Sequence, residues 1–265
     1  MPTQIRYMAV VSENPVRLAE FYSTYFGLKE IGRGAKGEIA LTDGFYNMSI
    51  MKPGSGAEEP GLSHFGIEID DIREVEARLE DFAPSADIQQ ESGDLFHGEY
   101  RVIDPYGWPV SLSTRHFGAP TVERGLPSLR HVAHRSPVSK HNEVCDFLTK
   151  VFGFRESESN ARLREKGSQA LWVGDGATAV AILPTWVGRD DFDAETESLK
   201  EGLNHYGWLV NDIFNFMDRL PEGSVTKRPD NRPAAEYRGH DPDGNPFDLS
   251  QDKGYEIDRG TWLHV

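Results

Sequence analysis

The sequence predicts an α+β protein built from two copies of one module, each consisting of a strand, a helix and further strands, twice over. The strongest indication is an internal repeat in which three blocks recur in the same order. Helically spaced apolar residues and short Gly-containing turns recur inside both copies as well. Chance does not produce such an ordered set of matches, and we therefore predict a duplicated fold.

The three repeated blocks lie at different offsets along the chain. Residues 14–28 (NPVRLAEFYSTYFGL) match residues 140–154 (KHNEVCDFLTKVFGF), an offset of 126 residues. Residues 61–66 (GLSHFG) match residues 202–207 (GLNHYG), an offset of 141. EYR followed by DPYG at 99–107 matches EYR followed by DPDG at 236–244, an offset of 137. The larger offset places an insertion in the second copy at 186–200, which we predict to be a surface loop or lid.

The expected elements follow from local signals in each copy. Strands are predicted at 5–11 and 129–135. Asn14 and Pro15 supply the N-cap and first-turn proline of a helix with apolar residues at helical spacing. Gly27 and Gly153 suit the left-handed position after a helix. Turns at 42–44 and 174–176 join strand pairs, a strand at 64–69 precedes a helix at 71–82, and a hairpin closes around Asp-Pro-x-Gly.

The predicted organisation is two modules and a tail. A Gly- and Pro-containing stretch at 117–127 is typical of a linker. It separates an N-terminal module at 1–118 from a C-terminal module at 126–252. The tail at 253–265 is interpreted as a lid or a subunit contact.

Composition excludes several classes of protein. The 265 residues carry a net charge of −15, and the densest cationic stretch, 162–166, is short and interrupted by an acid. Such a surface repels phosphate backbones, so nucleic acid is not an expected partner. The single cysteine, Cys145, excludes an intrachain disulfide framework and a Cys-based zinc site, and mid-helix it is interpreted as a small buried hydrophobe. No apolar run reaches the ~18 residues of a membrane span, and none follows the N-terminus as in a secretory signal, so a cytoplasmic protein is expected.

These motifs together resemble the vicinal oxygen chelate superfamily, which includes glyoxalase I, extradiol ring-cleaving dioxygenases and the bleomycin-resistance proteins. The resemblance rests on the Phe-Tyr-x-x-x-Phe-Gly-Leu helix end, the Gly-Leu-x-His-x-Gly strand and the Asp-Pro-x-Gly-x-Pro hairpin. It covers nearly the whole chain outside the insertion and the tail. It implies two tandem modules of paired βαβββ units, each curling into a half-open barrel.

The resemblance also implies where a metal would bind. In the superfamily, ligands come from the first strand, the strand that opens the second half, and the last strand of a module. These positions hold His131, His205 and Asp248 in the second module, a set that leaves sites on a metal open for substrate and oxygen. The first module has Tyr7, His64 and Ser111 there, an incomplete set, so His64 is expected to be structural or a substrate contact.

Two departures from the family pattern concern the site. The family normally has Glu where this chain has Asp248, one methylene shorter. Because Glu236, Arg238 and His240 alternate along the preceding strand, they are expected to share an inward face, and Glu236 could replace or supplement Asp248. The first module repeats Glu99 and Arg101, which favours a fold-supporting ion pair instead.

Arg238 stands where extradiol enzymes have Tyr, and we interpret it as a contact for an anionic group of the substrate. His240 is the candidate proton shuttle. His134, three residues after His131, is interpreted as structural.

The function implied by the resemblance is an extradiol-type dioxygenase, using Fe(II) or, alternatively, Mn(II), and acting on a catechol-like aromatic with O₂ in the catabolism of aromatic compounds. Two alternatives stay open. One is a glyoxalase-like metal-dependent isomerase or lyase, whose ligands usually come from both modules. The other is a metal-free small-molecule binding protein of the bleomycin-resistance type. A homo-oligomer is expected from the family habit of pairing barrels.

Overall fold

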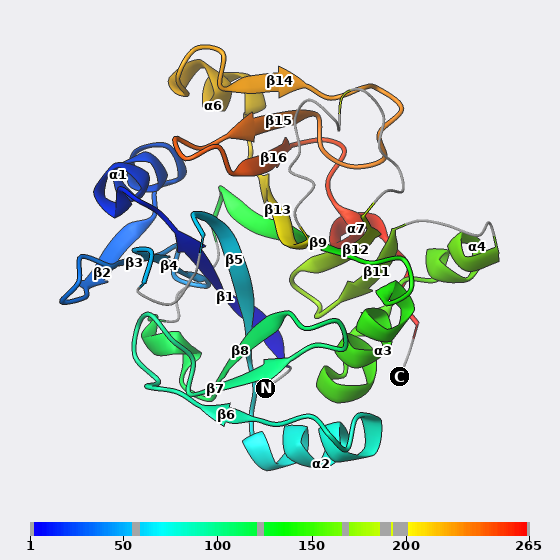
Figure 1. Ribbon diagram of the computed structural model, residues 1–265. Helices are drawn as coiled ribbons and strands as arrows, with labels where there is room; N and C mark the ends of the chain where they lie inside the picture. The colour runs from blue at the N-terminus through cyan, green and yellow to red at the C-terminus, as the bar shows by residue number, and fades with distance from the viewer. Residues whose placement is uncertain are drawn as a thin grey trace.

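In the computed structural model, the chain forms two eight-stranded sheets that lie side by side, and each is flanked by helices (Figure 1). The structure describes residues 3–54, 59–120, 125–165, 170–185, 192 and 201–263. The expected insertion at 186–200 therefore lies outside the described residues, apart from Phe192.

The first sheet has the strand order β2-β3-β4-β1-β5-β8-β7-β6. Each half is one βαβββ unit, and the two units join where β1 pairs antiparallel with β5. The strands are β1 Gln4–Val11, β2 Lys29–Arg33, β3 Ile39–Thr42, β4 Asn47–Met51, β5 Gly61–Glu68, β6 Gln89–Gln90, β7 Tyr100–Ile103 and β8 Pro109–Ser113. The helices are α1 Pro15–Phe26, α2 Ile72–Phe82 and the short 3₁₀ helix η1 His116–Gly118.

The second sheet repeats this order strand for strand as β10-β11-β12-β9-β13-β16-β15-β14. Its strands are β9 Ser128–Ser136, β10 Arg155–Glu156, β11 Leu171–Gly174, β12 Ala179–Pro184, β13 Gly202–Leu209, β14 Val225–Lys227, β15 Tyr237–His240 and β16 Pro246–Ser250. The helices are α3 His141–Phe152, α4 Ser159–Glu165, α6 Ile213–Arg219 and α7 Glu256–Arg259. The predicted α+β architecture of paired βαβββ units is confirmed.

The helix ends form as the sequence signals predict. The Asn14 side chain accepts a hydrogen bond from the Arg17 amide, and Pro15 occupies the first turn of α1. Gly27 and Gly153 end α1 and α3 with φ of 71° and 72°, a left-handed conformation that costs glycine little. These caps fix where each helix turns back toward its sheet.

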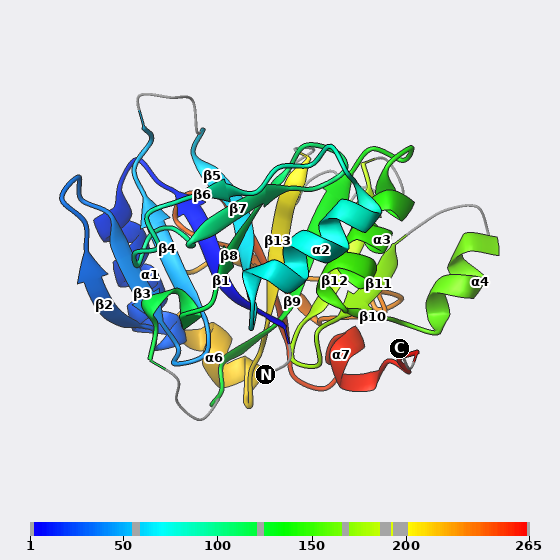
Figure 2. The ribbon, with the colours of Figure 1, turned by 90° about the horizontal axis from the view of Figure 1, so that it is seen from below.

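A helix of each module packs against the other module, so one hydrophobic core spans both. Phe26, in the last turn of α1, packs against Trp208, Phe216 and Phe247 of the second module. In the reverse direction, Phe147 of α3 contacts Phe82 of α2. Figure 1 and Figure 2 show α1 beside α6 and the second sheet, and α2 beside α3. A single hydrophobic cluster accordingly contains buried residues of both modules.

Buried hydrogen bonds also join the two modules. The Tyr22 hydroxyl donates to Asp241 Oδ2 at 2.8 Å, and the Ile5 amide donates to Asp175 Oδ2 at 2.7 Å. His134 lies here too, 3.8 Å from Asp104 and edge-on to Phe65. The interpretation of His134 as a structural residue agrees with this position.

Candidate functional site

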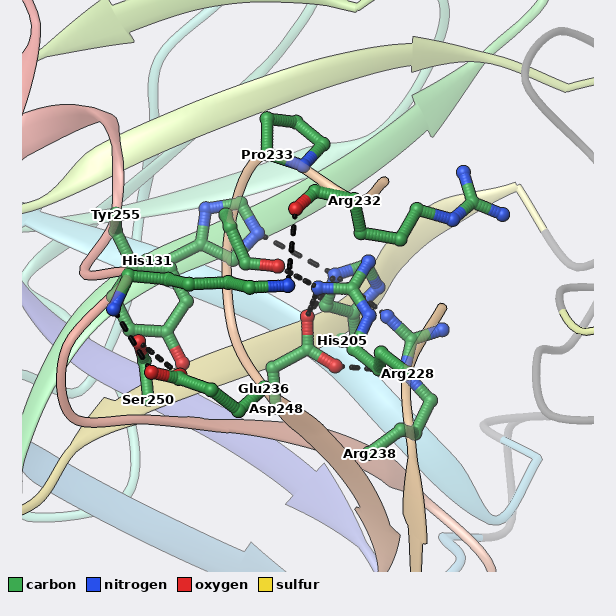
Figure 3. Close-up of polar contacts among 12 residues, drawn as sticks. His131, His205, Arg228, Arg232, Pro233, Glu236, Arg238, Asp248, Ser250 and Tyr255 are labelled. Carbon is green, nitrogen blue, oxygen red and sulfur yellow. Dashed lines mark hydrogen bonds and ion pairs between the residues drawn. The ribbon is translucent and has the colours of Figure 1, made fainter. Parts of the chain in front are cut away.

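The site in the second module is assembled by strand register. Gly207 on β13 lies opposite His131 on β9 and also opposite Asp248 on β16, while Arg238 on β15 lies opposite Asp248. Four neighbouring strands thus aim these side chains into the same half-barrel. His131, His205 and Asp248, predicted to meet from distant parts of the sequence, do lie together (Figure 3).

A β-bulge sets the orientation of His205. The register shifts between Leu203 and His205, which leaves Asn204 as an extra residue, and bulges commonly re-aim the next side chain. Asn204 Oδ1 lies 2.8 Å from His205 Nδ1. Because an amide oxygen only accepts, Nδ1 carries the proton and Nε2 keeps its lone pair. That Nε2 faces His131 Nε2 at 3.4 Å, and burial lowers the pKa of His131 to about 4, so His131 is neutral near pH 7.

Asp248 is enclosed by two arginines. Its Oδ1 accepts from Arg238 Nε at 2.7 Å, and its Oδ2 lies 2.9 Å from Arg228 Nη1. Burial alone would raise the pKa of Asp248, but the charges of the two arginines outweigh burial and hold it below its usual value. Arg238 is fully buried and Arg228 is nearly so. One carboxylate therefore faces two guanidinium groups, and these three groups together carry a net positive charge.

The donor set fits a divalent metal in kind, and its two histidines also fit one in spacing. Two neutral imidazoles and a carboxylate suit Fe(II), Mn(II) or Zn(II). Atoms that each lie ~2.1 Å from one ion are ~3.0 to 3.4 Å apart. The histidine pair has this spacing, and Asp248 Oδ2 lies slightly farther, 3.6 Å from His205 Nε2. As the side chains stand, no group of three or more His, Cys, Asp or Glu in the described ranges is arranged to hold a metal. Closing the site requires Asp248 to approach and Arg238 to move.

Aromatic side chains wall the site from solvent. The Tyr255 ring stacks on His131 with centroids 5.3 Å apart and planes 7° apart, and its hydroxyl donates to the Trp208 carbonyl. Trp172 of β11 also lies near the His131 ring, with centroids 5.5 Å apart and the planes tilted by 42°. Tyr255 belongs to the expected tail, so within the described residues this segment covers the second half-barrel rather than standing apart from it.

The equivalent place in the first module is closed by hydrogen bonds. His64 Nε2 lies 2.9 Å from Ser111 Oγ, and its Nδ1 lies 2.9 Å from Ser63 Oγ, the bulge residue that matches Asn204. Tyr7 donates to the Phe96 carbonyl and stacks on Phe117. Of the two readings left open for His64, the structural one agrees with these contacts.

Glu236 does not join the site, and the expectation that it could act as a ligand is corrected. Glu236 continues the pairing of β15, with its amide bonded to the Leu249 carbonyl, but its carboxylate bonds to Ser250 at the end of β16 and does not reach Asp248 or the histidines. Its carboxylate accepts from Ser250 Oγ and from the backbone amides that follow β16 (Figure 3). Glu99 does the same for Thr114 in the first module. This repeated carboxylate holds the chain as it leaves the last strand.

His240 and Cys145 complete the residues singled out in the sequence. His240 ends β15, half-buried, two residues beyond Arg238 and opposite Pro246. Its role as a proton shuttle stays a prediction. Cys145 is buried in α3, and desolvation raises the pKa of its thiol to about 12, which leaves it an unreactive hydrophobe.

Sequence reasoning missed Arg228, Asn204 and Tyr255 as site residues. Asn204 could have been found from its place beside His205 in the Gly-Leu-x-His block, which is matched by Ser63. Arg228 and Tyr255 have no local signal, because they reach the site only through the packing of β14, β16 and the tail.

Comparison with solved structures finds the same two-module fold at low sequence identity. The 2,3-dioxygenase LapB from Pseudomonas sp. KL28 is 16% identical, with a TM-score of 0.67 over 98% of this chain and 93% of that one. Homoprotocatechuate 2,3-dioxygenase from Arthrobacter globiformis is 15% identical, with a TM-score of 0.67 over 99% and 81%. A Mn(II)-bound glyoxalase from Novosphingobium aromaticivorans is 18% identical, with a TM-score of 0.66 over 94% and 82%.

These likenesses establish the fold. No protein-family model matches the sequence, and no curated protein matches it either. The chain has the same two-module fold as these dioxygenases and this glyoxalase, and the fold predicted from the sequence is confirmed. None of the helices in the described ranges combines the length and apolar character that crossing a bilayer would need.

Proposed function

We propose that the protein is a metal-dependent enzyme of the extradiol dioxygenase type, with the metal held by His131, His205 and Asp248 of the second module. Fe(II) is the expected ion and Mn(II) the alternative. The observation that carries the proposal is the pair of buried, facing Nε2 atoms 3.4 Å apart beside a carboxylate. The dioxygenases and the Mn(II)-bound glyoxalase named above, which share this fold, support it.

Contacts within the chain orient both proposed histidine ligands in the absence of a metal. Asn204 fixes the His205 tautomer, and Tyr255 holds the His131 ring in plane by stacking. Both imidazoles are buried, so water does not compete freely for their lone pairs. A bound metal would supply a Lewis acid for a substrate hydroxyl and a path for electrons to oxygen.

The proposed substrate is a catechol-like aromatic, which reacts with O₂. Arg238, on the strand beside Asp248, would bind an anionic oxygen of that substrate once it releases the carboxylate. His240 shares a strand face with Arg238 and is the proposed proton carrier, because an imidazole ring can both accept and donate a proton. Both roles rest on strand position and side-chain chemistry.

A second candidate, a metal-free binding protein, is favoured by one observation. In the first module Arg101, at the place of Arg238, is paired with Glu91 at 2.9 Å. In the second module Arg228 stands at the position of Glu91, so Arg238 has no glutamate there to pair with. On this interpretation Asp248 serves as the counter-charge of Arg238 and not as a metal ligand. A glyoxalase-like reaction that draws ligands from both modules is disfavoured, because Tyr7, His64 and Ser111 already bond within the first module.

The deciding measurement is the metal content of anaerobically purified protein, followed by oxygen uptake with a panel of catechols. We expect near-stoichiometric iron or manganese in the wild type and almost none in His205→Ala. The matched control is His64→Ala, which removes the equivalent histidine of the first module and should keep the metal.

Each outcome separates the candidates. Metal that persists in His205→Ala, or that is lost equally in both variants, would refute the assigned ligands. Bound metal without oxygen uptake would favour an isomerase or lyase. A wild type that stays empty after incubation with Fe(II), Mn(II) or Zn(II) would leave the binding protein as the remaining candidate.

A further inference from the structure

The Arg238 guanidinium contacts two of the three proposed metal ligands. Its Nε donates to Asp248 Oδ1 at 2.7 Å, and its Nη2 lies 3.3 Å from His205 Nε2. Because Asn204 fixes the proton of His205 on Nδ1, Nε2 is an acceptor and Arg238 the donor. The neutral nitrogen that would bind a metal is therefore already engaged by a buried cation.

The number of lone pairs distinguishes Arg238 from Arg228. An imidazole nitrogen has one lone pair, so it cannot bind a metal and accept from Arg238 at the same time. A carboxylate oxygen has two, so Asp248 Oδ2 can keep its 2.9 Å contact with Arg228 while it coordinates an ion. Arg238 competes with a metal directly, whereas Arg228 opposes it only through charge.

We propose that Arg238 is an internal competitor of the metal, so that a divalent ion binds His131, His205 and Asp248 only in exchange for the contact between Arg238 and His205. Arg238 thereby sets the metal affinity of the site. The inference rests on the proposed function for the location of the metal. It adds that Arg238 links Asp248 and His205 by hydrogen bonds in the metal-free protein. Metal binding then releases the guanidinium from His205.

The test is a titration with Zn²⁺ alone, a redox-inert probe, by calorimetry on wild type, Arg238→Gln and Arg228→Gln. Both substitutions remove one buried positive charge beside Asp248, but only the first removes the Arg238 contact with His205 Nε2. We expect Arg238→Gln to bind Zn²⁺ roughly tenfold or more tightly than the wild type, since a hydrogen bond from a charged donor is lost from the metal-free state. Arg228→Gln should change the affinity by a clearly smaller factor.

The outcomes separate this inference from the proposed function. Equal affinities in all three proteins, or a weaker Arg238→Gln, would overturn the competition while leaving the metal site in place. Tight binding by Arg238→Gln together with an empty wild type would support the competition and overturn the metal-dependent function. No binding by any of the three would overturn both.

A measurement on the wild type guards against a variant that does not fold. The Arg238 Nη2–H resonance, assigned by its loss in Arg238→Lys or by triple-resonance spectra of the wild type, should report the hydrogen bond to His205 in the metal-free protein. On saturation with Zn²⁺ we expect it to shift and to exchange faster with water. A resonance that stays unchanged while Zn²⁺ binds would overturn the exchange.

Discussion

The charged residues of the two modules occupy equivalent positions but pair differently. Glu91 and Arg228 stand at the same place, each with its amide bonded to the carbonyl of the repeated glutamate. In the first module Arg101 pairs with Glu91 near the sheet edge. In the second, the acid lies at Asp248, inside the half-barrel beside His205. Relocating one carboxylate places a negative charge beside the histidines of the second module.

Another carboxylate, Asp104, makes stability depend on pH. Its Oδ1 accepts from the amides of Tyr106 and Trp108, yet burial raises its pKa to about 6. The unfolded chain has a pKa of ~3.9 there, so the folded protein binds this proton more tightly. The contribution is therefore fully present below about pH 4 and is lost as the pH rises through 6.

We predict that Asp104→Asn stabilises the protein at pH 8 by up to about 3 kcal/mol, from a shift of about two pKa units at ~1.4 kcal/mol each. Asparagine keeps the acceptor oxygen for both amides. Urea unfolding at pH 5 and pH 8 measures the effect, with a smaller gain expected at pH 5. Equal gains at both pH values would contradict the assigned pKa.

Gly66 and Gly207 leave space for the aromatic rings that pack over each sheet. A Cβ on Gly66 would lie 2.6 Å from Phe117 Cζ, and a Cβ on Gly207 would lie 2.5 Å from Tyr255 Cζ. Phe117 and Tyr255 follow the last strand of their own sheets and stack on the residue that occupies the first ligand position, Tyr7 or His131. Each glycine therefore permits the close approach of a covering ring.

Gly207→Ala is predicted to displace Tyr255 and to loosen the segment that contains α7. We expect a loss of ~1 to 3 kcal/mol from overpacking, together with faster amide exchange at 255–259. Chemical denaturation and hydrogen exchange measure the two effects.

Gly66→Ala is the matched control, because it overpacks Phe117 instead. It should cost a similar free energy while leaving exchange at 255–259 unchanged. Unaltered exchange in Gly207→Ala would argue against the dependence of the tail on this glycine.

The exchange of helices between modules makes the molecule one folding unit. Phe26 is buried among three aromatic side chains of the other module, and the Tyr22 hydroxyl reaches Asp241 there. Neither module can unfold without exposing apolar surface of its neighbour. The half-barrel that holds the site is therefore supported from the first module, although no first-module residue is assigned as a ligand.

Phe26→Ala should destabilise both modules together. Truncating a buried phenylalanine costs ~3 to 5 kcal/mol. We expect the variant to unfold in one cooperative transition, as the wild type does, but at a lower midpoint temperature. Calorimetry gives the test, through the agreement of calorimetric and van't Hoff enthalpies. Separate transitions, with only one moved by the substitution, would show that the modules are independent.

The sequence alone determined the duplication, the order of elements and the candidate ligand positions. Local signals suffice for these, because Asn14, Gly27 and the Asp-Pro-x-Gly turns act on their own neighbours, and because the repeat aligns Tyr7 with His131 and Ser111 with Asp248. Strand register then brought His131, His205 and Asp248 together as expected. The short helix α4 escaped prediction, since it is held by contacts with distant segments, such as the bonds of Asn160 to the Trp172 backbone.

Tertiary structure alone decided what surrounds those ligands. Alternation along the strand put Glu236 on the face of Arg238, but its carboxylate is bonded by Ser250 and by the amides of the chain after β16. Arg228 lies 20 residues from Asp248 in sequence, and Tyr255 lies far from His131, so only packing reveals that they touch. Contacts between distant segments depend on how sheets curl and tails fold back. No local sequence pattern predicts these contacts. They place Arg228 beside Asp248 and Tyr255 over His131, and so they set the charge and the burial of the site.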